Sequence, residues 1–238
     1  MPIMKPVISL LSVIAFLSLA VAGQDPTKVA PDSYKLQFEN EFVKLLRVNY
    51  AAHAKVPVHD HSRFPAAYVY LSDSGPIRFV HSGWDDPVLT RPATKAGSFR
   101  LSPTRFEDET HAVENNGDLA SEFLRIEIRT EAPDRKSLTG RFAPYDGNRQ
   151  SGLNKMEFEN SQLRATRIIS RPGARLDVSA QPRRPSLIVV IAGVGEISKG
   201  QTFWLAPGQS RQFETSQGNG LQQIELLLFD FKTEPKKR

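Results

Sequence analysis

The chain has 238 residues, of which 39% are hydrophobic and 24% charged, and its formal net charge is +5. These values are typical of a globular protein and exclude both a disordered tail and a multi-span membrane protein. The sequence has no cysteine, which excludes disulfides, thiolate metal ligands, thiol catalysis and a lipidated N-terminal cysteine. The basic side chains are scattered apart from the tail Lys236–Arg238, so no stripe of positive charge indicates a nucleic-acid partner.

The N-terminal segment 1–22 is predicted to be a secretory signal peptide. A short basic start is followed by the uncharged apolar run Pro6–Val21, and Ala20–Ala22 places small residues at the spacing that signal peptidase accepts. The alternative is an N-terminal membrane anchor, but spanning a bilayer takes about 20 apolar residues and the run is shorter. We therefore expect a periplasmic or secreted protein, cleaved after Ala22 or Gly23, with no stable membrane anchor afterwards.

An internal repeat organises the rest of the chain. The tripeptide Phe38–Asn40 recurs as Phe158–Asn160, an offset of 120 residues. The same offset, without a gap, matches Arg47 with Arg167, Val48 with Ile168, Val58 with Val178, Leu71 with Ile191 and Gly75 with Gly195. The chain is therefore predicted to hold two copies of one module. We place the first at 25–132 and the second at 154–233, with the polar segment 133–153 as a linker or covering loop.

Both copies are predicted to consist of β-strands. Short runs rich in β-branched and aromatic residues lie at Ala67–Leu71, Glu122–Ile128, Leu187–Ile191 and Ile224–Phe229. Turn residues such as Asp73–Gly75, Asn115–Gly117 and Pro207–Gly208 separate the runs at intervals of roughly ten residues. After the N-terminal segment no stretch has sustained helical periodicity. The expected fold class is all-β, with two small antiparallel sandwiches or barrels.

The histidines are the residues most able to carry chemistry. All five, at positions 53, 59, 61, 81 and 111, lie in the first copy. His59 and His61 are two apart on a predicted strand, so both rings project to one face, about 6 to 7 Å apart at the backbone. His111 on a second strand could complete a set of three around one ion, because imidazole nitrogens bind divalent metals at about 2.1 Å. We expect His53 and His81 to be surface or loop residues.

These residues give the chain a resemblance to the cupin family, and more closely to its double-domain (bicupin) members. His59 and His61 match the His-x-His of the first family motif, Pro103 the proline of the second, and His111 with Asn115 its His-x-x-x-Asn ending. The resemblance implies two tandem antiparallel jelly-roll barrels, with a divalent metal held by the three histidines in the first. Fe, Mn, Ni, Cu and Zn all accept imidazole ligands, so the residues do not distinguish among them.

The sequence departs from the family pattern at the carboxylate ligand. The family's glutamate falls on Ala66, and three extra residues separate Pro103 from His111. Glu109, two residues before His111 and so on the same face of a regular strand, could supply a carboxylate as a fourth ligand, directly or through water, or support the ligands from behind. The alternative is a solvated glutamate in an acidic loop.

The second copy lacks the metal-binding residues of the first. At the offset of 120, the paired histidines correspond to Ser179 and Gln181, and Ala66 corresponds to Ser186. After the turn Pro207–Gly208, Gln212 takes the place of the third histidine. None of these side chains is a good ligand for a transition metal. The second barrel is therefore predicted to be metal-free.

Two functions are compatible with these observations. One is an exported protein that binds a divalent metal, a small ligand or both without turnover, which the missing glutamate and the altered second copy favour. The other is a metal-dependent enzyme, such as a dioxygenase or isomerase, acting on a small anionic or chelating substrate, because three neutral imidazoles leave the charge of the ion uncompensated. Tyr68, Tyr70 and Asn115 are expected to line the pocket. No catalytic residue is identified, and the family resemblance is compatible with a homodimer.

Overall fold

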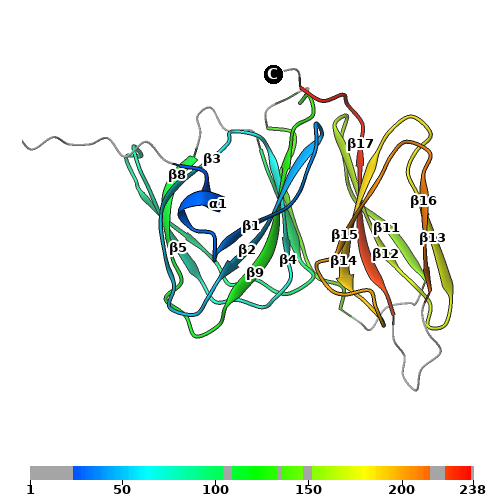
Figure 1. Cartoon of the computed structure of the whole chain (residues 1–238), viewed down its shortest axis with the longest axis horizontal. Coiled ribbons are helices and arrows are strands. Elements are labelled where there is room, and N and C mark those ends of the chain that lie inside the picture. The colour runs from blue at the N-terminus through cyan, green and yellow to red at the C-terminus, as the bar shows by residue number, and fades with distance from the viewer. Residues whose placement is uncertain are drawn as a thin grey trace, which may run out of the picture.

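A computed structural model of the chain describes residues 24–103, 109–132, 134, 136–146, 152–214 and 223–236. The predicted signal peptide, 1–22, lies outside these ranges. One short helix, α1 (Pro26–Val29), precedes a succession of antiparallel strands that form two tandem jelly-roll barrels (Figure 1). The predicted fold class is therefore confirmed. Within the described ranges, no helix is long and apolar enough to cross a membrane.

The first barrel is made of a six-stranded and a four-stranded sheet. The larger sheet has the order β1-β2-β9-β4-β7-β10 and the smaller one β3-β8-β5-β6. The strands are β1 (Tyr34–Glu39), β2 (Val43–Tyr50), β3 (Lys55–His61), β4 (Ala66–Tyr70), β5 (Ile77–His81), β6 (Val88–Arg91), β7 (Phe99–Ser102), β8 (Glu109–Glu114), β9 (Ser121–Ile128) and β10 (Gly140–Phe142). Strand β10 falls inside the segment 133–153 that we expected to be a linker, yet it pairs with β7 and extends the larger sheet.

The second barrel repeats the plan with fewer strands. A five-stranded sheet has the order β11-β12-β17-β14-β15, and β13 pairs with β16 in a two-stranded sheet. The strands are β11 (Leu153–Glu159), β12 (Leu163–Ile169), β13 (Arg175–Ser179), β14 (Ser186–Ala192), β15 (Thr202–Leu205), β16 (Ser210–Glu214) and β17 (Glu225–Phe231). After β17 the chain returns to the first barrel, where Pro235 bridges Thr130.

The first hairpin of each barrel shows why the repeated tripeptide is present in both copies. The β1–β2 ladder shifts register between Leu36 and Phe38, and the β11–β12 ladder shifts at the corresponding place, just before Phe158. The Asn40 side chain accepts hydrogen bonds from two backbone N–H groups of its turn, and Asn160 does the same. The tripeptide thus encodes a bulge followed by a tight turn capped by asparagine.

The central strands β4 and β9 of the larger sheet of the first barrel are buried on both faces, because the second barrel packs against the outer side of this sheet (Figure 1). On β4, Tyr68 and Tyr70 belong to the interior of the first barrel, whereas Ala67 and Val69 join a core shared with the second barrel. A strand covered on both faces is apolar throughout rather than alternating. This explains the continuous burial of Ala66–Tyr70.

Arg167 on β12 ties the two barrels together. Its side chain is 1% exposed and forms ion pairs with Glu157 and Glu225 of its own barrel. Its guanidinium also donates to the backbone carbonyls of Gly97 at 3.0 Å and Ala143 at 3.3 Å, on the first-barrel side. A buried cation with two carboxylates and two carbonyls is well compensated, and it fixes how the outer face of one barrel meets the other.

Candidate metal centre

The candidate ligands are brought together by two neighbouring strands of the smaller sheet. His59 on β3 lies directly across from His111 on β8. Val56 pairs with Val113 and His59 with His111, so a step of three residues on β3 lies opposite a step of two on β8. The extra residue on β3 is a β-bulge. The bulge changes the phase of the strand, so that Val56, His59 and His61 all face the interior although they are not evenly spaced. The three imidazoles are buried, with at most 3% exposure.

The three rings form a compact group inside the barrel. The ligand atoms that they offer lie within 4.8 Å of one another, and the ring centroids are separated by 4.7 to 5.2 Å. Nδ1 of His61 and Nε2 of His111 are buried without a hydrogen-bond partner. Buried polar atoms without partners are costly in the absence of a ligand, and such nitrogens are what a transition metal needs. The residues present therefore fit a metal ion.

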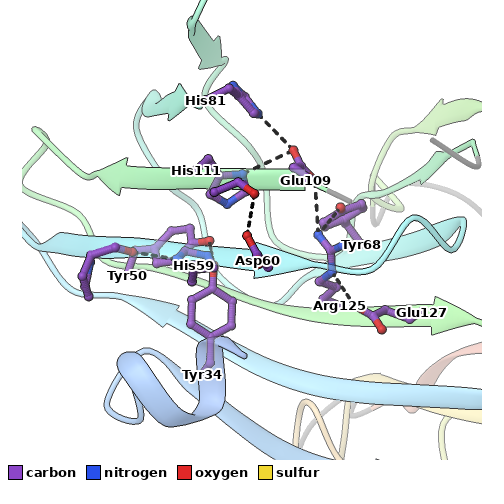
Figure 2. Close-up of polar contacts among 12 residues, drawn as sticks. Tyr34, Tyr50, His59, Asp60, Tyr68, His81, Glu109, His111, Arg125 and Glu127 are labelled. Atoms are coloured by element: carbon purple, nitrogen blue, oxygen red, sulfur yellow. Dashed lines mark hydrogen bonds and ion pairs between the residues drawn. The ribbon is translucent and has the colours of Figure 1, made fainter. Parts of the chain in front are cut away.

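The hydrogen bonds of His59 define which nitrogen is available. Nδ1 lies 2.8 Å from the carbonyl oxygen of Pro57, which can only accept, so Nδ1 carries the proton. Nε2 then holds the lone pair and accepts from the Tyr34 hydroxyl at 2.9 Å, and the Tyr34 hydroxyl is 2.5 Å from that of Tyr50 (Figure 2). Neither tyrosine is among the site residues predicted from the sequence. Tyr50 could have been found, because it continues the alternation of Leu46 and Val48 on β2.

His81 is a buried member of the same cluster, so the expectation that it is a surface or loop residue is wrong. It lies on β5 across from His111, is 2% exposed and places Nε2 at 3.0 Å from Oε1 of Glu109. The indole of Trp84 stacks on its ring with centroids 3.8 Å apart. The clue in the sequence is the alternation Ile77, Phe79, His81, which places the histidine on the face of two large apolar residues. His53, in contrast, has a side chain that is 66% exposed.

Glu109 is buried rather than solvated, with 5% exposure. Together with His81 and His111 it forms a second group whose possible ligand atoms lie within 4.8 Å of one another. Its Oε1 lies 3.4 Å from Nδ1 of His111 (Figure 2). Burial raises the pKa of this carboxyl, but contacts with His111 and His81 and the charge of Arg125, 3.9 Å away, lower it below its usual value. Glu109 is therefore ionised beside His111, on the strand that supplies the third imidazole.

The imidazoles themselves are neutral at pH 7. Burial lowers the pKa of His59 to about 4, with a further contribution from His111. Burial and the charge of Arg125 lower the pKa of His61 well below its usual value. Burial also lowers the pKa of His111, against the opposing effect of Glu109. Neutral imidazoles keep a lone pair for a cation, which is the state that a metal ligand requires.

A cavity of about 90 Å³ opens beside these histidines. His61, His111, Glu109 and Tyr68 line it, together with several aromatic and arginine side chains. Two of the predicted lining residues are not among those that line it. Tyr70 packs on Phe123 and accepts a hydrogen bond from Nε of Arg100. Asn115 uses its amide to hold a turn, donating to the backbone carbonyls of Tyr50, Ala51 and Leu119.

In the second barrel, the residues that correspond to the paired histidines do not face the interior. Strand β13 pairs with β16 without a register shift, and Val178 is the residue that faces the interior. Ser179, the counterpart of His59, is exposed, as are Gln181 and Gln212. The second barrel thus lacks the bulge that turns the paired positions inward in the first.

Comparison with solved structures finds proteins that share this fold. No protein-family model matches the sequence, and no curated protein matches it significantly. Among solved structures, the bacterial pirin YhhW of Escherichia coli in complex with nickel(II) is 13% identical, with a TM-score of 0.57 over 84% of this chain and 91% of that one. A Pseudomonas aeruginosa protein described as glyoxylate-induced is 12% identical, with a TM-score of 0.55 over 86% of this chain and 82% of that one. Salicylate 1,2-dioxygenase of Pseudoaminobacter salicylatoxidans is 12% identical, with a TM-score of 0.50 over 80% and 72%. At these identities the likeness establishes the fold alone.

Proposed function

We propose that the first barrel binds a divalent metal ion through His59, His61 and His111. The observation that carries this proposal is a group of three buried, neutral imidazoles whose ligand atoms lie within 4.8 Å of one another. The nickel(II) complex of the E. coli pirin, which shares the fold, supports it. When bound, the ion would supply a Lewis acid with coordination positions open to the cavity.

The surrounding residues would hold and tune the ligands. The carbonyl of Pro57 orients His59 by accepting from its Nδ1, and this leaves Nε2 for the ion. Glu109 lies where a carboxylate can accept from the second nitrogen of His111 and so fix its tautomer and orientation. In this arrangement Glu109 supports a ligand from behind rather than completing the set with His59 and His61. Imidazole ligands suit Fe, Mn, Ni, Cu and Zn, so the metal depends on geometry and supply.

We infer binding of the metal and of a small ligand in the cavity as the primary function. The alternative is a metal-dependent enzyme of the dioxygenase or isomerase type. One feature favours the alternative: Tyr34 lines the cavity and its hydroxyl lies 2.9 Å from Nε2 of His59, so a hydrogen-bond donor stands next to the candidate ligands. The location proposed for either function is outside the cytoplasm, since residues 1–22 have the pattern of an export signal.

Elemental analysis of matched variants tests the proposal. The purified protein is incubated with Ni(II), passed through a desalting column and analysed for bound metal. The wild type is expected to retain about one equivalent, and the His59→Ala/His61→Ala variant none. His53→Ala is the control, because His53 is in the same barrel but exposed and paired with Asp118. Retention of equal nickel by all three proteins, or by none of them, would contradict the proposal.

A further inference from the structure

A row of cationic side chains crosses the larger sheet of the first barrel beside the candidate metal centre. Arg125 on β9 pairs in register with Tyr68 on β4, Tyr68 pairs with Arg100 on β7, and Arg100 pairs with Arg141 on β10. All four side chains line the cavity. Three arginines and one tyrosine, from four neighbouring strands, therefore face one small space.

The charges in this row are unevenly compensated. Arg125 has carboxylates nearby, with Glu127 at 3.3 Å and Glu109 at 3.9 Å. Arg100 contacts tyrosines instead of carboxylates. Its guanidinium lies 4.0 Å from the ring centroid of Tyr68, and its Nε donates a hydrogen bond to the hydroxyl of Tyr70. Among the described residues, no carboxylate forms an ion pair with Arg100 or Arg141. Like charges directly opposite on adjacent strands destabilise a sheet. The pairing of Arg100 with Arg141 is therefore unfavourable, and a bound anion would remove the repulsion between them.

Arg91, at the end of β6, adds a fourth cation and is the most deeply buried of those without a carboxylate. It is 7% exposed and donates to the hydroxyls of Ser74 at 3.1 Å and Ser121 at 2.7 Å. Its Nε is buried without a hydrogen-bond partner, although the side chain lines the cavity. Within the described part of the chain no carboxylate pairs with it. A buried guanidinium without a counter-ion is unfavourable, which points to a ligand that supplies the negative charge.

We propose that the cavity binds a short organic acid with two oxygen-bearing groups, one held by Arg91, Arg100 and Arg141 and the other directed to the histidines. Guanidinium groups recognise carboxylates through paired, charge-assisted hydrogen bonds. The cavity is lined at once by these arginines and by His61 and His111, so one molecule can reach both. Its volume of about 90 Å³ favours a short aliphatic acid, since it is smaller than the engineered core cavity of roughly 150 Å³ that binds benzene. This inference rests on the proposed metal site for its second anchor only.

Calorimetric titration with malonate, a short dicarboxylate, tests the inference on the whole protein. The titration is made twice, once on protein stripped with EDTA and once on protein loaded with Ni(II). Malonate is expected to bind the stripped protein through the arginines alone and the loaded protein more tightly, whereas the uncharged analogue malonamide binds neither. The affinity of the stripped protein should fall as salt is added, because the contact is ionic.

Paired variants separate the arginine site from the metal site. Arg100→Gln/Arg141→Gln should weaken malonate binding about tenfold or more while leaving Ni(II) binding unchanged, and Arg100→Lys/Arg141→Lys should lose less. Arg211→Gln is the control, because Arg211 also stacks on a ring, at 3.6 Å from the centroid of Phe203, but lies in the second barrel. Thermal melting shows that each variant is folded.

The outcomes distinguish the two proposals. Arginine-dependent malonate binding without nickel binding would support the anion site and overturn the metal site. Nickel binding without malonate binding, or malonate binding that survives the loss of Arg100 and Arg141, would overturn the anion site.

Discussion

Replacing Tyr34 with phenylalanine is expected to strengthen metal binding. Nδ1 of His59 is committed to the carbonyl of Pro57, so the only lone pair that His59 can offer a metal is on Nε2. The Tyr34 hydroxyl occupies that lone pair at 2.9 Å. An incoming ion must displace this hydrogen bond, whose net contribution is about 0.5 to 1.5 kcal/mol. Removing it should raise the affinity for Ni(II) by roughly two- to tenfold.

The same substitution should destabilise the metal-free protein. The Tyr34 and Tyr50 hydroxyls are 2.5 Å apart and their residues are 1% and 2% exposed, so Tyr34→Phe leaves the hydroxyl of Tyr50 buried without this partner. Such a group costs about 1 to 3 kcal/mol in the free energy of unfolding. The variant is therefore expected to combine a weaker fold with a tighter metal site.

Two measurements check this prediction: calorimetric titration with Ni(II) and urea unfolding in EDTA. Tyr50→Phe is the matched control, because it keeps the donor to His59 and should leave the nickel affinity within about twofold of wild type. A Tyr34→Phe protein that binds Ni(II) more weakly than wild type would refute the reasoning. That result would mean either that Tyr34 helps to hold the ion or that Nε2 of His59 is not a ligand.

Three further predictions concern the supporting residues. Glu109→Gln should lower the nickel affinity about 10- to 100-fold, because the carboxylate beside His111 is lost; an unchanged affinity by calorimetry would remove Glu109 from the site. The metal-free protein should lose stability as the pH falls. The unfolded chain binds a proton at His59 near pH 6.5, whereas the folded state, with a pKa of about 4, does not, so between these values the unfolded state gains protons and the free energy of unfolding drops by about 3 kcal/mol from this residue alone. Urea unfolding at pH 7.5 and pH 4.5 measures this loss, and constant stability would contradict it. Arg167→Met should cost about 3 to 5 kcal/mol, because it leaves Glu225 in a buried place without its cation and leaves Glu157 with only Lys155, at 3.6 Å. A change below about 1 kcal/mol in the same assay would show that these ion pairs are not buried as described.

Much of the fold could be predicted from the sequence because it depends on local pattern and on repetition. Phe38–Asn40 and its copy mark a bulge and a turn, both of which are local features that the same residues produce twice. Side chains alternate between the two faces of a strand. This alternation predicts that Tyr68 and Tyr70 of β4 share one face and that Ala67 and Val69 share the other. Strand β10 was missed because it has only three residues and its polar surroundings are typical of a loop.

The site could be predicted only in part, because its composition depends on register between strands. His59, His61 and His111 were found from their spacing, and the structure brings them together. The position of His81 across from His111, and of Arg100 across from Arg141, is set by pairings that no local pattern reveals. The bulge that turns His59 inward is likewise a property of the β3–β8 pair and not of either strand alone.

X-ray absorption at the nickel edge tests the metal site most directly. The spectrum of the Ni(II)-loaded protein is expected to show nitrogen neighbours at about 2.1 Å together with the outer-shell scattering of three imidazole rings. In the His111→Ala protein one ring should disappear from that scattering. A spectrum with oxygen neighbours alone, or one that His111→Ala leaves unchanged, would contradict a metal ion held by the three histidines.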